Sequence, residues 1–123
     1  MPPPDDRSAL RDIQLACELV EAFVADMSRE AFLGDAKTFS ATQMQLATLG
    51  EAVKRLSTNF RESAPDVDWR GWAGVRDIIV HAYDIVDLDQ IWLVAVEEVP
   101  VLRVTIQWLL ERFDPGAESS EHS

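Results

Sequence analysis

The chain has 123 residues, is 47% hydrophobic and carries a formal net charge of -11, with 22 acidic against 11 basic residues. This size and apolar content predict one compact domain and exclude two. Because the net charge repels nucleic acid at long range, any contact with nucleic acid must be local. We interpret residues 1–113 as the domain and residues 114–123 as a flexible acidic tail, rich in Pro, Gly and Ser, whose His122 carries no chemistry.

The sequence shows neither a secretion signal nor a membrane span. Its start, MPPPDDRSAL, lacks a basic stretch followed by an apolar run, and no segment approaches the roughly 20 apolar residues that cross a bilayer. We therefore expect a cytoplasmic protein with no membrane contact. The single cysteine, Cys17, has no partner for an internal disulfide and falls within an apolar periodicity, so we interpret it as a core residue.

The first half of the chain predicts two helical segments. The first covers roughly residues 6–25, where apolar residues recur at spacings of three and four. The second covers residues 36–60 and keeps its apolar residues near one face, with Gly50 inside it. A glycine in the middle of a helix costs about 1 kcal/mol relative to alanine, so Gly50 indicates a close approach between helices.

The second half predicts two more helices. Pro65 ends the preceding helix, and Asp68 is well placed to cap the next, which covers residues 69–86. The remainder to residue 113 is helical, with a kink or break expected at Pro100. We interpret Trp69 and Trp72 as core or interface anchors rather than base-stacking platforms. Without strand alternation or repeats, the periodicity predicts an all-α protein, an antiparallel up-and-down bundle of four to five helices.

The third predicted helix carries polar residues within an apolar run, GVRDIIVHAYDIVD. At about 100° per residue and with Arg76 at zero, Tyr83 lies at about -20°, Asp77 at about 100° and His81 at about 140°. These side chains are predicted to face away from the core. The opposite arc is apolar and consists of Trp72, Val75, Ile78, Ile79, Ala82 and Val86.

Each of these polar residues also has an ordinary structural interpretation. An arginine on a helix is usually solvated or salt-bridged, a histidine is usually structural, and a tyrosine at a core edge commonly only packs. The spacing alone therefore does not establish a site.

The order of sequence landmarks is more specific. RDIIVHAY fits the pattern R-x4-H-x-Y and resembles the HEPN superfamily, particularly the HepT-like toxins of toxin-antitoxin pairs. The segments LGEAVKRLS, PDVDWRGWAGVRDIIVHAYDIVDLDQIW and VEEVPVLR resemble landmarks of the same family, so the likeness covers about residues 7–113. One variable position is Asp77, where asparagine is frequent in the family.

The resemblance implies a metal-independent endoribonuclease that cleaves RNA through its own 2'-hydroxyl and needs no cofactor. Such cleavage requires a base, an acid and positive charge on the phosphorane oxygens. His81 is suited to acid or base catalysis and Arg76 to gripping phosphate. The family dimerises through the helix that bears the motif, so that both copies of Arg76 and His81 line one cleft. We assign Asp77 to orienting His81 or Arg76, since Asp77 and His81 are four apart on the predicted helix and can hydrogen-bond.

Tyr83 resembles the residue to which a cognate MNT-type nucleotidyltransferase antitoxin adds AMP. The bulky negative group would fill the cleft and repel RNA phosphate. The alternative is that Tyr83 only binds RNA or orders the helix. For the whole chain, two other interpretations remain, a noncatalytic HEPN nucleotide-binding or substrate-positioning partner of a nucleotidyltransferase, and a purely structural helical dimer. The presence of both Arg76 and His81 argues against the first, and four outward polar residues argue against the second.

Overall fold

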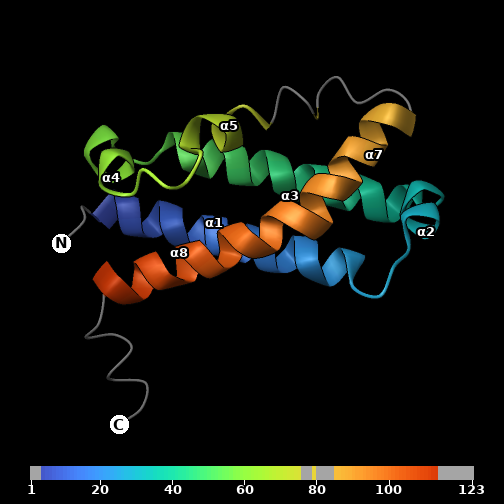
Figure 1. Cartoon of the computed structure of the whole chain (residues 1–123), viewed down its shortest axis with the longest axis horizontal. Helices are drawn as coiled ribbons and strands as arrows, with labels where there is room; N and C mark the ends of the chain where they lie inside the picture. The colour runs from blue at the N-terminus through green and yellow to red at the C-terminus, as the bar shows by residue number, and fades with distance from the viewer. Residues whose placement is uncertain (1–3, 76–78, 80–84, 114–123) are drawn as a thin grey trace, which may run out of the picture.

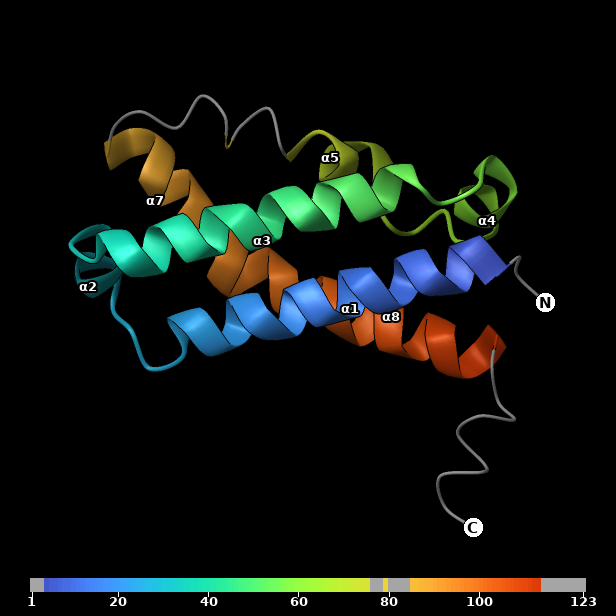
Figure 2. The same cartoon turned by 180° about the vertical axis from the view of Figure 1, so that it is seen from behind.

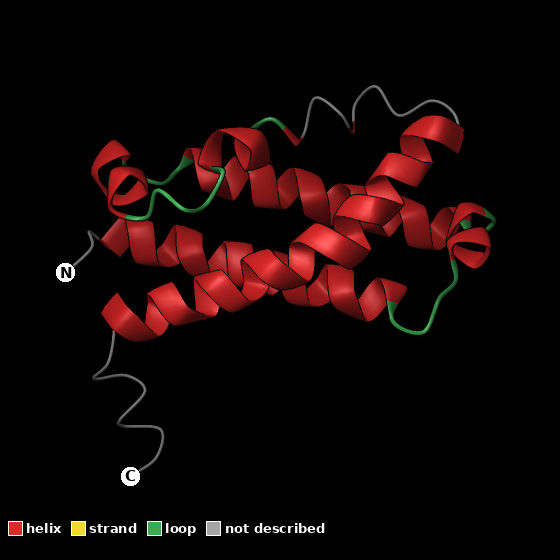
Figure 3. Ribbon diagram, viewed as in Figure 1, coloured by secondary structure: helices red, strands yellow, loops and turns green. Residues whose placement is uncertain are grey.

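The computed structural model describes residues 4–75, 79 and 85–113, and every regular element among them is helical (Figure 3). The predicted all-α bundle is confirmed. In chain order the elements are α1 (Pro4–Val24), α2 (Arg29–Leu33), α3 (Ala36–Lys54), α4 (Thr58–Ser63), α5 (Trp69–Ala73), α7 (Ile85–Leu93), the π-helical turn η1 (Val94–Glu98) and α8 (Val99–Phe113). Within these described residues, no helix combines the length and the apolar run needed to cross a bilayer.

Three long rods make the bundle. Helices α1 and α3 lie side by side and run in opposite directions, and the continuous rod α7–η1–α8 crosses them (Figures 1 and 2). Helix α1 packs against both α3 and α8, so the core lies between these three helices. The first residues of α1 and the last residues of α8 meet at one end of the bundle, next to α4 (Figure 1).

Helix α1 forms close to its predicted limits and buries the predicted face. Its inward residues follow the helical spacing of three and four, and Ile13, Cys17 and Val20 are fully buried. Burial raises the pKa of the Cys17 thiol to about 12, because the charged thiolate is disfavoured in an apolar environment. The interpretation of Cys17 as a core residue is confirmed.

The second predicted segment is not a single helix. Helix α3 ends at Lys54, and α4 begins at Thr58 with Ser57 as its N-cap. The Ser57 hydroxyl accepts a hydrogen bond from the Phe60 amide at 3.1 Å, while the Ser57 amide and hydroxyl each donate to the carboxylate of Asp6 at 2.7 Å. Asp6 is 1% exposed. A buried acid on α1 thus fixes the turn that ends α3, which the periodicity within residues 36–60 could not reveal.

Pro100 distorts its helix without breaking it. The five residues of η1 directly precede α8, and Pro100 is the second residue of α8. A proline inside a helix lacks a donor and its ring collides with the carbonyl four residues before it, and the wider π-helical turn relieves that collision. The predicted disturbance is therefore at the expected place, but the chain continues as one rod.

Candidate functional site

The predicted site residues Arg76, Asp77, His81 and Tyr83 all lie outside the described residues. Their assignment, with Arg76 and His81 catalytic, Asp77 supporting and Tyr83 an AMP acceptor, stays a prediction. The described residues on either side of this segment pack against the bundle. We call α5, Val75, Ile79 and α7 the frame of the motif.

Helix α5 begins where the sequence predicted, at Trp69. Asp68 caps it, accepting a hydrogen bond from the Gly71 amide at 3.0 Å. Trp69 is 6% exposed, donates from its indole nitrogen to the carbonyl of Ala64 at 2.9 Å, and makes an edge-on contact with Phe60. The interpretation of Trp69 as a core anchor is confirmed. The helix then ends at Ala73 with Gly74 as its C-cap, so residues 69–86 do not start as one uninterrupted helix.

At Gly50, helix α3 packs against the segment that leads to the motif. A β-carbon at Gly50 would lie 3.1 Å from the carbonyl oxygen of Trp72 and 3.2 Å from a γ-carbon of Val75. Both distances are tighter than ordinary contact, so the absence of a β-carbon at Gly50 lets the two backbones approach this closely without a shift. The close approach predicted from the mid-helix glycine is confirmed.

Two residues of the predicted apolar arc beside the motif, Val75 and Ile79, pack toward the core. Val75 is 5% exposed, and Ile79 is partly buried against the core. Because these residues are four apart in sequence and both pack inward, this part of the arc is confirmed. On the C-terminal side of the motif, Asp89 of α7 accepts a hydrogen bond from Arg29 at the start of α2, which ties α7 to the bundle.

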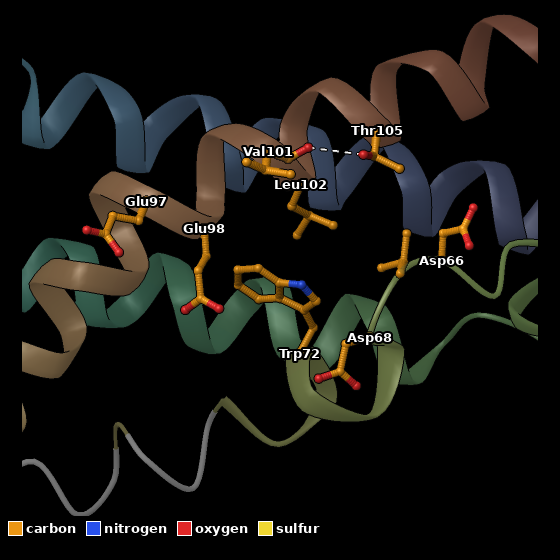
Figure 4. Close-up of a pocket in the computed structure, with 9 residues that line it drawn as sticks. Asp66, Asp68, Trp72, Glu97, Glu98, Val101, Leu102 and Thr105 are labelled. Carbon is orange, nitrogen blue, oxygen red and sulfur yellow. Dashed lines mark hydrogen bonds between the residues drawn. The ribbon is translucent and has the colours of Figure 1, made fainter.

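A groove lies beside this frame, between the segment 63–75 and the rod α7–η1–α8. Its middle cavity has a volume of about 240 Å³, and Trp72, half-buried, points into it from α5 toward α8 (Figure 4). A second cavity of about 270 Å³ shares Asp68, Trp72 and Glu98 with the first and reaches Val75 and Gln90. A third, of about 110 Å³, shares Asp66, Val67 and Thr105 with the first and reaches Arg112. The three cavities therefore form one continuous depression.

Sequence reasoning missed this groove. The available signal was the outward stripe Val101, Val104 and Trp108 on α8, at spacings of three and four, opposite the buried Leu102, Ile106 and Leu109. Among the described residues, no group of three or more His, Cys, Asp or Glu side chains is close enough together to hold a metal ion. The carboxylates of the groove are therefore not a metal site in this arrangement.

Comparisons with known proteins identify the family. The family model described as "Ribonuclease HepT-like" matches residues 13–109. An all-α bundle with the R-x4-H pattern inside the matched region agrees with this match, and the chain belongs to the HepT-like ribonuclease family of the HEPN superfamily. The resemblance predicted from the sequence landmarks is confirmed.

Several relatives carry ribonuclease names. The chain is 38% identical over 94 residues to "Probable ribonuclease HepT" of Thermococcus cleftensis, covering 76% of this chain and 86% of the relative. It is 37% identical over 100 residues to "Putative RNase MJ0127" of Methanocaldococcus jannaschii, covering 81% and 83%. It is 34% identical over 106 residues to "Putative RNase TTE0752" of Caldanaerobacter subterraneus, covering 86% and 95%. No solved structure matches the chain. The family-level activity is that of a ribonuclease.

Proposed function

We propose that this chain is the toxin of a toxin-antitoxin pair and a metal-independent endoribonuclease. The observation that carries the proposal is the R-x4-H-x-Y pattern within the region matched by the ribonuclease family. The packing of Val75 and Ile79 supports it, because these neighbours of Arg76 and His81 take up the inward positions of the segment.

The proposed chemistry uses the RNA's own 2'-hydroxyl as the nucleophile. One His81 removes the 2'-hydroxyl proton, and the oxygen attacks the adjacent phosphorus. A second His81 protonates the leaving 5'-oxygen, so the products are a 2',3'-cyclic phosphate and a 5'-hydroxyl. The Arg76 guanidinium stabilises the extra negative charge on the phosphorane oxygens.

We propose a homodimer because one chain supplies one histidine where the reaction has two proton transfers. A two-fold axis between the motif-bearing segments would bring Arg76 and His81 of one protomer beside those of its partner. Asp77 would orient His81 or Arg76 in this composite cleft. A chain that is monomeric at micromolar concentration and still cuts RNA would refute the composite site.

Tyr83 is the residue through which an antitoxin would inhibit the ribonuclease. We propose that a cognate MNT-type nucleotidyltransferase transfers AMP from ATP to the Tyr83 hydroxyl, releasing pyrophosphate. The new phosphodiester would put negative charge within reach of Arg76, two helical turns away on the predicted stripe, where substrate phosphate must bind. Cleavage would then stop through occupation of the cleft and withdrawal of Arg76.

The ribonuclease proposal is tested with the purified full chain and single-stranded RNA. Cleavage should persist in excess EDTA and leave cyclic phosphate ends, detected by their resistance to phosphatase until acid treatment. Loss of cleavage in EDTA with recovery on adding Mg²⁺ would contradict metal independence. Absence of cleavage with or without metal would favour the noncatalytic HEPN partner.

The antitoxin proposal is tested by intact-mass spectrometry. Incubation with the cognate nucleotidyltransferase and ATP should add the mass of AMP to the chain and silence it. Tyr83→Phe keeps the ring but lacks the oxygen that accepts AMP, so it should gain no mass. An equal gain in both proteins would place the modification elsewhere. Inhibition on mixing, without any mass gain, would mean that the antitoxin acts by occlusion.

A further inference from the structure

The groove beside α8 carries a net negative charge, since its described lining holds four acids and one base, Arg112. Its lining includes four exposed carboxylates, Asp66, Asp68, Glu97 and Glu98. None of them forms an ion pair within the described part of the chain, whereas Asp12, Glu21 and Asp89 on other faces pair with Arg55, Arg103 and Arg29. These four carboxylates therefore have no cationic partner within the described residues.

The same groove also exposes apolar surface. In its lining Val101 is 67% and Trp108 55% exposed, and Val104, 58% exposed, lies beside them on the same face of α8. Trp72 adds its indole from the opposite wall and stands between Glu98 and Asp68 (Figure 4). Clustered exposed apolar residues rimmed by polar groups are typical of protein-protein contact surfaces.

We infer that this groove docks a basic amphipathic segment of a protein partner. Arginine or lysine side chains would meet the carboxylates of Asp66, Glu97 and Glu98, and a cation can also stack on the Trp72 indole. Apolar side chains of the segment would cover Val101, Val104 and Trp108. The lining from Gln90 to Arg112 follows about 30 Å of helix, which is the length of roughly nine residues of extended chain.

The negative charge of the groove argues against two other ligands, RNA and a second copy of this chain. RNA phosphates would face four unpaired carboxylates, a repulsion that the exposed Trp108 does not offset. A second copy of this chain, related by a two-fold axis through the groove, would bring Glu97 and Glu98 of one protomer toward the same residues of its partner. Like charges placed opposite one another destabilise such a contact, so a basic partner is the better fit.

The inference is tested with a defined probe and the full chain. The probe is an acetylated and amidated decapeptide that alternates Leu and Arg, and its control alternates Leu and Glu. Titration into ¹⁵N-labelled protein should shift the Trp72 and Trp108 indole signals and the amides of η1 and α8, with saturation. Failure to saturate, equal binding of the acidic peptide, or shifts centred on other surfaces would overturn the inference.

Charge-matched variants separate docking from general attraction to an acidic protein. Glu97→Gln with Glu98→Gln removes two charges from the groove, and Glu18→Gln with Asp26→Asn removes two exposed charges from α1 and the turn that follows it. The groove pair should weaken binding of the basic peptide about tenfold, and the control pair less than about twofold. Equal weakening by both pairs would show that only net charge matters and would overturn the proposal.

A third variant tests the apolar component. Val101→Ser changes an exposed side chain, so the fold should be unaffected while peptide affinity falls about threefold. If an oligouridine shifts the groove signals more strongly than the basic peptide, or if these signals shift with protein concentration alone, the groove is an RNA or self-association surface instead. Because the titration measures binding, its failure leaves the ribonuclease assay unaffected.

Discussion

The packed rods and the motif-bearing segment impose different demands on their side chains. In α1, α3 and the inner face of α8, residues such as Ile13, Leu46 and Ile106 have no exposed surface, and their role is to fill the core. In the motif-bearing segment 74–86, Val75 and Ile79 pack inward while the predicted chemistry belongs to other positions. We therefore expect substitutions in the core to change stability and substitutions at the motif positions to change activity.

The largest expected effect is on activity alone. His81→Ala and Arg76→Ala should each lower the rate of RNA cleavage at least about 100-fold, because each removes a proton-transfer or charge-stabilising group. Their free energies of unfolding should stay within about 0.5 kcal/mol of the parent, since the predicted positions lie off the packing arc. Both quantities are measured on the purified full chain, by fluorescent-RNA cleavage and by urea unfolding.

Arg70→Ala is the matched control for that prediction. Arg70 is an exposed arginine on α5, shortly before the motif, so its removal makes the same change in charge. It should keep most of the cleavage activity. Undiminished cleavage by the Arg76 or His81 variant would remove that residue from the catalytic assignment, and unfolding of either variant would favour a structural role.

Substitution of Asp6, the buried acid of α1, should have a smaller effect, and on stability alone. Asp6→Ala leaves the Ser57 amide and hydroxyl without their acceptor in a site from which water is excluded, and it frees the turn that starts α4. The free energy of unfolding at pH 7 should fall by about 2 kcal/mol. Cleavage of RNA should be unchanged at temperatures where the variant is folded.

Asp5→Ala provides the comparison for Asp6. Asp5 is the preceding residue on the same helical turn but is exposed. Its loss removes only a favourable charge at the N-terminus of α1, which is worth about 0.5 kcal/mol. Equal unfolding midpoints for the two variants would show that the Asp6–Ser57 contact does not hold the α3–α4 turn.

The long helices were predicted from the sequence more accurately than the short helices and turns that connect them. Periodicity was sufficient for α1 and for most of α3, because each buries a long face at one spacing. Helix α2 was not predicted, since its five residues are too short to show a period, and the end of α3 depends on Asp6 from far away in the chain. Motif order identified the family, because those landmarks are local in sequence.

The groove could not be predicted in the same way. Its walls come from segments separated in sequence, around Asp66 and Trp72 on one side and Glu98 and Trp108 on the other. Only their packing in three dimensions brings the carboxylates and the apolar stripe together. The outward face of α8 was visible as a pattern, but its partner across the groove was not.

The smallest expected effect comes from Gly50→Ala, a substitution in a packed helix that should also change activity at the motif. Gly50→Ala adds a β-carbon at 3.1 Å from the Trp72 carbonyl oxygen and 3.2 Å from Val75. Alanine is the better helix former, but the Trp72 carbonyl belongs to the backbone and must shift with α5. Overpacking should outweigh the gain in helix propensity and leave a net loss of about 1 kcal/mol in the free energy of unfolding.

Gly50→Ala should also alter the position of the motif. Val75 directly precedes Arg76, so displacing α5 and Val75 by a few tenths of an ångström should lower RNA cleavage about threefold at temperatures where the protein stays folded. Gly34→Ala is the control, because the added carbon there lies 3.4 Å from its nearest neighbour, an ordinary contact. It should change neither stability by more than about 0.5 kcal/mol nor cleavage. If Gly50→Ala proves as stable and as active as Gly34→Ala, the α3–α5 contact does not position the motif, and the two regions are independent.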